Sequence, residues 1–174
     1  HDPNNPNSLS ENFIYSLYID SGGYAWIGTS NGGLNRLTLS TNNVIRYQNN
    51  PLRPYSINSN EILSIHEDQG GILWIGTSNG LDRYDRKTHA FSHFQYDPND
   101  PNSLSANRIY KVFVDRTNTL WVGTASGLDR YDRTNGTFIH YGPQVGDPNS
   151  LSGPLVYSMI EDTDGNLWVG TLDN

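Results

Sequence analysis

The residues best suited to acid–base chemistry are four aspartates that recur along the chain. Each opens a four-residue turn, and they are Asp20 (DSGG), Asp68 (DQGG), Asp115 (DRTN) and Asp162 (DTDG). Carboxylates that meet in one pocket can act as general acid and base. A catalytic pair, however, more often breaks a repeat than obeys it, and an Asp at the start of a turn caps its own backbone amides. We therefore interpret these carboxylates as structural caps.

The histidines and glycine-rich segments do not indicate a metal-binding or phosphate-binding site. His89 and His93 have a metal-binding spacing for a helix, but this stretch has strand periodicity, so surface or interstrand histidines are expected. GTSNGG at 28–33 looks like a phosphate loop, yet no helix follows it. No nucleophile motif of the G-x-S-x-G type is present. We expect no catalytic residue, no metal site, no cofactor and no enzymatic activity.

The recurrent aspartates and glycine-rich segments belong to an internal repeat of 47 or 48 residues. Its marker is W-I/V-G-T, which contains every Trp and occurs at 26–29, 74–77, 121–124 and 168–171. The loop phrases keep step with it: DPNNPNSLS at 2–10, DPNDPNSLS at 97–105, DPNSLS at 147–152 and a degraded YSIN at 55–58. A period maintained over the whole chain indicates one supersecondary unit per repeat.

Each repeat predicts four strands, because its apolar residues alternate with a period of two. In the second repeat the strands are expected at ILSIHE (62–67), around WIGT, around LDRYD and at FSHFQY (91–96). Four antiparallel strands in each repeat of this length are typical of a β-propeller blade, whereas helical repeats need a 3.6-residue apolar stripe. The predicted fold class is therefore all-β, built of propeller blades.

The repeats amount to about three and a half blades. We expect blade 1 at about 12–48, blade 2 at about 60–96, blade 3 at about 107–141 and a half blade 4 at about 155–170. Closed propellers have roughly four to eight blades, because an open end exposes unpaired strands and a bare blade face. The chain is thus expected to be a piece of a longer protein or to complete a ring by self-association.

The repeated side chains have structural roles in this scheme. One Trp per blade fills the wedge between stacked sheets, and the Gly that follows allows the next backbone to approach closely. The charges of the D-R-Y-D segments, such as Asp82 with Arg83 and Asp129 with Arg130, are expected to pair between neighbouring blades.

Composition narrows the possible partners. The 174 residues carry a net charge of −7 with scattered Lys and Arg, which excludes a nucleic-acid-binding surface. No apolar run has membrane-spanning length, so no direct membrane insertion of this segment is expected. The absence of Cys excludes disulfides and thiolate metal sites.

The sequence resembles the two-component regulator propeller repeats, with the pattern N-S-L-S, an apolar strand, E-D-x-x-G-x-L-W-I-G-T, x-x-G-L-x-R-Y-D and an aromatic strand. EDTDGNLWVGT at 161–171 and TASGLDRYD at 124–132 match closely, whereas PYSIN at 54–58 and Asn118 depart from the pattern. The resemblance implies the periplasmic sensor region of bacterial sensor or hybrid histidine kinases and related regulators. It also implies sensing of extracellular ligands, in some members glycan fragments.

We therefore predict a non-catalytic segment that senses a ligand or binds a partner. In a propeller, the loops from fourth to first strand and from second to third strand share one face, where a ligand is expected near the axis. Candidate residues for a small polar ligand, such as an oligosaccharide, are Asn31, Arg53, Tyr55, Asn60, Asn79 and Arg108. Other expected partners are neighbouring propeller repeats or a second copy. The alternatives are a structural self-assembling fragment and a propeller lyase or glycoside hydrolase.

Overall fold

The computed structural model describes residues 1–172, which form antiparallel sheets and no helix. The strands are β1 (Ile14–Ile19), β2 (Tyr24–Thr29), β3 (Leu34–Thr38), β4 (Asn43–Tyr47), β5 (Ile62–Glu67), β6 (Leu73–Thr77), β7 (Gly80–Asp85), β8 (Ala90–Phe94), β9 (Ile109–Val114), β10 (Leu120–Thr124), β11 (Leu128–Asp132), β12 (Thr137–Tyr141), β13 (Leu155–Glu161) and β14 (Leu167–Leu172). Sheets β1–β4, β5–β8 and β9–β12 are blades 1 to 3, and β13–β14 is half of blade 4. The predicted propeller fold is confirmed.

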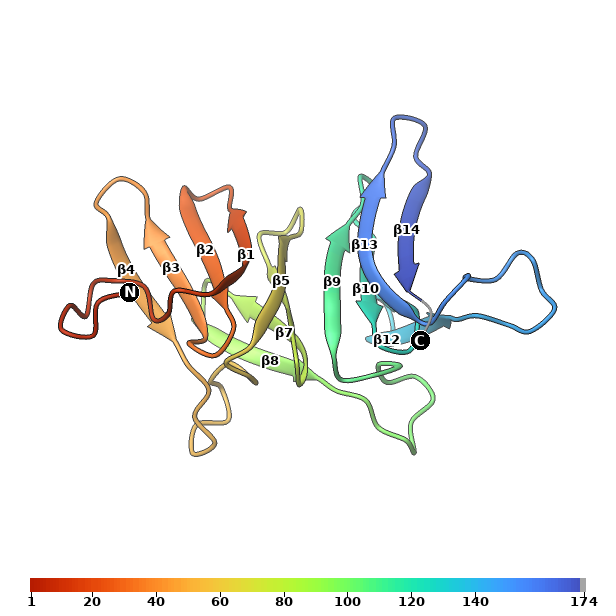
Figure 1. Ribbon diagram of the computed structural model, residues 1–174, viewed down its shortest axis with the longest axis horizontal. Helices are drawn as coiled ribbons and strands as arrows, with labels where there is room; N and C mark the ends of the chain where they lie inside the picture. Colours follow the sequence, from red (N-terminus) through yellow and green to blue (C-terminus); the bar gives the residue numbers. More distant parts are fainter. Residues whose placement is uncertain (173–174) are drawn as a thin grey trace.

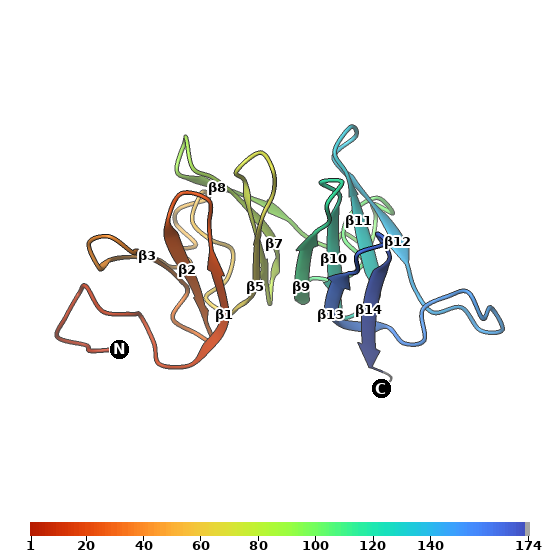
Figure 2. The same ribbon diagram turned by 90° about the horizontal axis from the view of Figure 1, so that it is seen from above.

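The blades lie side by side, with the first strand of each blade in an inner row. β5 lies between β1 and β9, and β9 also contacts β13. Figures 1 and 2 show the blades fanned out, with blade 1 at one end and β13–β14 at the other. The fourth strands β4, β8 and β12 form the outer edges of their sheets.

The turn between the first and second strands of each blade has the predicted geometry. The amide of its fourth residue donates to the carbonyl of the opening Asp, for example Gly71 to Asp68 at 2.9 Å and Asn118 to Asp115 at 2.9 Å. Gly71 has φ of 78° and Asn118 has φ of 66°. Gly and Asn adopt this left-handed conformation with the least strain, which explains their place in the repeat.

The core lies between the blades, where the side chains of Trp26 and Trp74 meet the next blade. Trp26 and Trp74 are each only 1% exposed. The Gly two residues after each Trp brings the next inner strand close, since a Cβ on Gly28 would lie 2.6 Å from Cγ2 of Ile62 and one on Gly76 would lie 2.7 Å from Cγ2 of Ile109. The expected packing roles of Trp and Gly are therefore confirmed at these two interfaces.

Candidate functional site on the blade connectors

The recurrent aspartates use both carboxylate oxygens within their own turn. Oδ1 of Asp68 accepts hydrogen bonds from the amides of Gly70 at 2.9 Å and Ile72 at 3.1 Å. Oδ2 accepts the indole N–H of Trp74 at 2.9 Å. Burial raises the pKa of Asp68, but hydrogen bonds from Trp74, Ile72 and Arg133 outweigh burial and hold the pKa below its ordinary value. The same pattern of two amides and one indole occurs at Asp20, Asp115 and Asp162, which confirms that these residues are structural caps.

Two of these carboxylates, Asp20 and Asp68, also bind an arginine from the next blade. A guanidinium nitrogen of Arg133 lies 2.9 Å from Oδ2 of Asp68, and the group lies 5.8 Å from the ring centroid of Trp74. Arg86 contacts Oδ2 of Asp20 at 2.9 Å in the same manner. These two cross-blade ion pairs therefore come from the arginines that follow the D-R-Y-D segments, and Arg108 with Glu61 and Arg116 with Glu161 form two others. The expectation that charges within D-R-Y-D would form these pairs was wrong.

The loops that lead into each blade, which we call connectors, share one closed shape. They are connector 1 (residues 2–10), connector 2 (49–58), connector 3 (97–105) and connector 4 (144–152). A serine hydroxyl in each accepts the amide of the residue six positions earlier, at 2.9 Å in connectors 1, 3 and 4 and at 3.0 Å in connector 2. The repeated serine therefore closes the loop, as an Asn- and Ser-rich turn sequence favours.

Connectors 2 and 3 cover the outer edge of the blade that they enter. The carbonyl of Asn102 accepts the amide of Phe138 on β12 at 2.9 Å, and the carbonyl of Tyr55 accepts the amide of Phe91 on β8 at 3.4 Å. An outer strand otherwise presents unpaired backbone groups to solvent. The loop phrase thus protects an edge strand as well as linking two blades.

The connectors also meet the turns between second and third strands, as the sequence predicted for one shared face. The amide of Gly33 donates to the carbonyl of Asn60 in the next blade at 2.9 Å. Nδ2 of Asn79 donates to Oδ1 of Asn58 at 3.2 Å, and the hydroxyls of Ser59 and Ser78 lie 2.9 Å apart. This face is therefore a continuous network of polar side chains and backbone groups.

A histidine on the outer strand of blade 2 holds connector 2 in place. Nδ1 of His93 lies 2.7 Å from Oδ1 of Asp82, and Nε2 lies 3.0 Å from the carbonyl oxygen of Pro54. Oδ2 of Asp82 accepts the amide of Asn58 at 2.8 Å, so one buried carboxylate binds both the histidine and the connector. The hydrogen bond from Asp82 raises the pKa of His93, and burial raises the pKa of Asp82.

Blade 3 repeats this arrangement with other residues. Nδ1 of His140 lies 2.7 Å from Oδ1 of Asp129, and Nε2 lies 3.0 Å from the carbonyl oxygen of Pro101 in connector 3. Sequence reasoning expected interstrand histidines but missed these two pairs. The available signal was the spacing, because an Asp precedes a His by 11 residues at the same phase of the second and third repeats.

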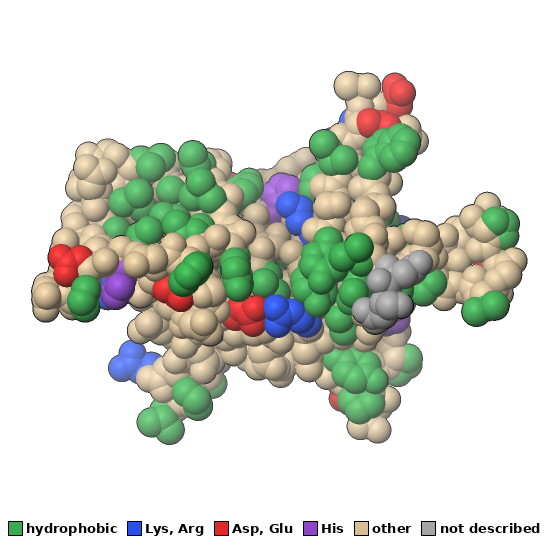
Figure 3. Space-filling model, viewed as in Figure 1, with side chains coloured by type: hydrophobic (Ala, Val, Ile, Leu, Met, Phe, Trp, Pro, Cys, Tyr) green, Lys and Arg blue, Asp and Glu red, His purple; other side chains and the backbone are tan. Residues whose placement is uncertain are grey.

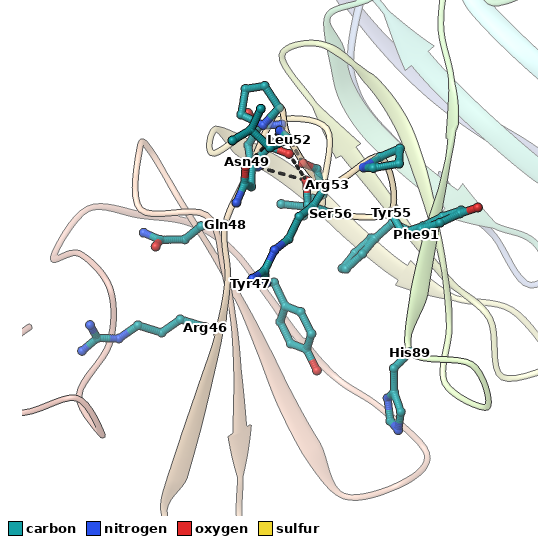
Figure 4. A pocket seen from close by; sticks show the side chains of 14 residues that line it. Arg46, Tyr47, Gln48, Asn49, Leu52, Arg53, Tyr55, Ser56, His89 and Phe91 are labelled. Carbon is teal, nitrogen blue, oxygen red and sulfur yellow. Dashed lines mark hydrogen bonds between the residues drawn. The ribbon is translucent and has the colours of Figure 1, made fainter.

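A cavity of about 720 Å³ opens beside connector 2, between the outer strands β4 and β8 (Figure 4). Arg53 and Tyr55 line it from the connector, Tyr47 from β4, and His89 and Phe91 from the end of blade 2. Figure 4 shows the side chain of Arg53 extending from the connector toward Tyr47. The cavity therefore combines aromatic rings with a guanidinium and an imidazole, a lining suited to a polar ligand with a flat face.

The predicted ligand-binding residues do not all converge. Arg53 and Tyr55 line the cavity, whereas the other four lie elsewhere: Asn60 accepts the amide of Asn49 at 2.8 Å, Asn79 contacts Asn58, Arg108 pairs with Glu61 at 2.6 Å, and the amide of Asn31 donates to Glu11 at 2.7 Å. Participation of any of the six in ligand binding stays a prediction. Arg53 and Tyr55 are the two whose positions suit a common ligand.

Within residues 1–172, no group of three or more His, Cys, Asp or Glu side chains is arranged to hold a metal ion. No helix long and apolar enough to cross a membrane occurs in this part of the chain.

The repeat unit itself matches a known family. Residues 8–31, 56–79, 103–126 and 150–173, together more than half of the chain, match the family described as two component regulator propeller. The chain belongs to this family. Each matched stretch of the regulator propeller runs from the closing serine of a connector through the W-I/V-G-T strand, so the family pattern includes the turn in which Asp binds Trp.

Two solved structures similar to this regulator propeller are extracellular domains from B. thetaiotaomicron assigned to hybrid two-component systems. The BT3049 domain is 30% identical with a TM-score of 0.82, and the match covers 95% of this chain and 23% of that one. The BT4673 domain is 32% identical with a TM-score of 0.74, and the match covers 94% and 23%. The regulator propeller thus spans about a quarter of the length of these domains.

A more distant neighbour is an enzyme with the same fold. Virginiamycin B lyase from Staphylococcus aureus is 17% identical with a TM-score of 0.65, over 90% of this chain and 48% of the lyase. This likeness shows only that both chains form propeller blades. No curated protein matches the regulator propeller.

Proposed function

We propose that the chain is a non-catalytic sensory segment of a bacterial two-component-type membrane signalling protein. Its family, and the extracellular domains that it resembles, support a place on the periplasmic side of the membrane. Its ligand is small and polar, such as an oligosaccharide. Binding changes the position of a connector and thereby the packing of neighbouring propeller repeats.

The cavity beside connector 2 is the observation that supports placing the ligand there. Tyr55 is 73% exposed at its rim, and Tyr47 and Phe91 lie on its wall. Aromatic faces stack on the apolar faces of sugar rings, while the guanidinium of Arg53 donates to hydroxyl or carboxylate oxygens. A ligand held there contacts a connector and two blades at once, which couples binding to blade packing.

A panel of neutral and acidic oligosaccharides, screened by thermal shift and followed by calorimetry, tests this function. We expect R53A and Y55A to weaken the binding of any hit at least tenfold. N102A, at the position in connector 3 that corresponds to Tyr55, is the matched control and retains binding. Undiminished binding by R53A and Y55A places the site elsewhere, and cleavage of any oligosaccharide in the same mixtures contradicts a non-catalytic role.

Self-association is a second candidate function, favoured by two apolar faces at the ends of the array. Tyr15, Leu17 and Ile19 alternate along β1 and are 55%, 66% and 61% exposed. At the other end Trp168 is 63% exposed and pairs across the sheet with Ile160, which is 66% exposed. Figure 3 shows hydrophobic side chains gathered over blade 1. These faces correspond to the ones that bury Trp26 and Trp74 inside the array.

Light scattering across a concentration series tests self-association. A dimer or larger ring that dissociates in both W168D and L17D supports closure through these faces. L52D is the matched control, because Leu52 is 91% exposed on connector 2, away from both faces. A monomer at every concentration rules out a self-completed ring.

A further inference from the structure

The two ring nitrogens of His93 both face hydrogen-bond acceptors. A carbonyl oxygen has no hydrogen to give, so Nε2 must carry the proton in its 3.0 Å contact with Pro54. The 2.7 Å contact between Nδ1 and Oδ1 of Asp82 then needs a second proton, held by the ring as imidazolium or by the carboxyl group. Removing one of the two protons leaves a ring nitrogen whose lone pair faces an acceptor.

We propose that the pair of His93 and Asp82 is a proton-dependent latch that holds connector 2 on blade 2, and that His140 and Asp129 form the equivalent latch for connector 3. The closed latch is the protonated pair. Loss of one proton leaves the ring a single proton for two acceptors. That proton stays on Nδ1 beside the carboxylate, so Nε2 no longer donates to the proline carbonyl. The connector is thereby released from the outer strand.

Burial of the two carboxylates makes the latch strongly dependent on protonation. The side chains of Asp82 and Asp129 have no exposed surface, so water does not compete for the hydrogen bond that each makes with its histidine. The other titratable groups facing His93 are Asp97 and Asp100 of connector 3, which line a cavity with it. His140 likewise lies beside Asp147 of connector 4.

The direction of the pH response follows from the pair. Asp82 raises the pKa of His93 above its ordinary value, and burial raises the pKa of Asp82 itself. The folded protein thus holds these protons more tightly than the unfolded chain does. The latch is closed below the raised pKa of His93 and opens as the pH rises through it.

Blade 1 contains a counterpart that cannot respond in this way. Asn35 and Arg46 occupy the positions of the Asp and the His, and Arg46 donates to the carbonyl of Ser8 in connector 1 at 2.8 Å. Oδ1 of Asn35 accepts the amide of Ser10 at 2.8 Å. An amide does not titrate and an arginine stays protonated, so connector 1 is held at any accessible pH.

The latch also controls the cavity, a step that rests on the ligand-binding function proposed above. Pro54 lies between Arg53 and Tyr55 in the chain, so its carbonyl fixes the segment that carries both cavity residues (Figure 4). An open latch therefore disorders one wall of the site. Ligand affinity is expected to fall as the pH rises through the raised pKa of His93.

Nuclear magnetic resonance of the ligand-free protein tests the latch. The ¹⁵N shifts of the His93 and His140 rings report protonation, and backbone relaxation of residues 50–56 and 97–103 reports connector order. We expect order parameters to fall from about 0.85 to below about 0.6 as the rings lose a proton. The variant D82N/H93R copies the pair of blade 1, so its connector 2 is expected to stay ordered while connector 3 still responds.

The outcomes separate the two proposals. Order parameters of connectors 2 and 3 that do not change across ring deprotonation overturn the latch, as does an unchanged pH response of connector 2 in D82N/H93R. The wild-type titration keeps the test decisive should the double variant fold poorly. Because no ligand is needed, a latch that titrates stands even if every oligosaccharide fails to bind.

Discussion

The indole of Trp74 and the carboxylate of Asp68 are joined by a 2.9 Å hydrogen bond within one hairpin of blade 2. The same oxygen of Asp68 receives the guanidinium of Arg133 from blade 3. Tyr131 of that blade also packs on Trp74, with ring centroids 5.3 Å apart. One carboxylate therefore ties the shape of a turn to the contact between two blades.

Replacing Asp68 with Asn should destabilise the protein by about 2 kcal/mol, because it removes a charge-assisted contact and leaves a buried N–H group facing the indole. Urea unfolding measures the change. D162N is the matched control, since Asp162 makes the same bonds to its turn and Trp168 but lies in an exposed hairpin. An equal loss in both variants contradicts a contribution from the next blade.

Truncation of the repeated Trp should depend on its place in the array. Trp74 is 1% exposed and Trp168 is 63% exposed. We expect W74A to lower the free energy of unfolding by about 3–5 kcal/mol and W168A by less than half of that, because little surface is buried at Trp168. The two variants are compared by chemical denaturation. Similar losses count against packing between blades as the role of this Trp.

The glycine two residues after the Trp should tolerate a side chain better in the half blade β13–β14 than in blade 2. A Cβ on Gly76 would lie 2.7 Å from Ile109 in blade 3, whereas one on Gly170 would meet only Ser158 of its own hairpin. We expect G76A to cost about 1–3 kcal/mol in unfolding free energy and G170A to cost less. Thermal unfolding of both variants checks this order, and a larger loss in G170A refutes it.

His66 should make the fold less stable in mild acid. Burial lowers the pKa of His66 below its ordinary 6.5, and Nδ1 accepts the amide of Val114 at 3.1 Å. The unfolded chain then takes up a proton that the fold resists, so stability falls as pH drops below 6.5 through the lowered pKa. The stability advantage of the wild type over H66Q should therefore shrink from about pH 7 to about pH 5. H1Q controls for the loss of a histidine, and an advantage that does not change with pH contradicts this assignment.

The candidate site was only partly predictable from sequence. Six residues were predicted on equal terms, and of these Arg53 and Tyr55 share a cavity. Asn60, Asn79 and Arg108 lie on the expected loops, but their hydrogen bonds serve the scaffold. Sequence position shows which loop a polar residue occupies. It does not show whether a neighbouring blade already uses its hydrogen-bonding groups.

The His–Asp pairs illustrate the same limit. Asp82 and His93 pair across adjacent strands, a relationship that the repeat spacing contained. The third partner, Pro54, is 39 residues from His93, and only the path of the connector along β8 brings them together. A histidine that appeared to be an ordinary interstrand residue thus has two acceptors and a protonation requirement.

The sequence by itself determined the blade, because a period of two, a turn with Asp first and Gly or Asn fourth, and a Trp in phase are local patterns that specify a hairpin. It also determined that blades stack, since a large side chain followed by Gly suits only a close interface. The tertiary structure decided which copies of a repeated residue are buried. Trp74 and Trp168 occupy the same position of the repeat motif, yet of the two only Trp74 is covered by a complete neighbouring blade. Burial depends on what another part of the chain places alongside, and so do the cavity and the latches.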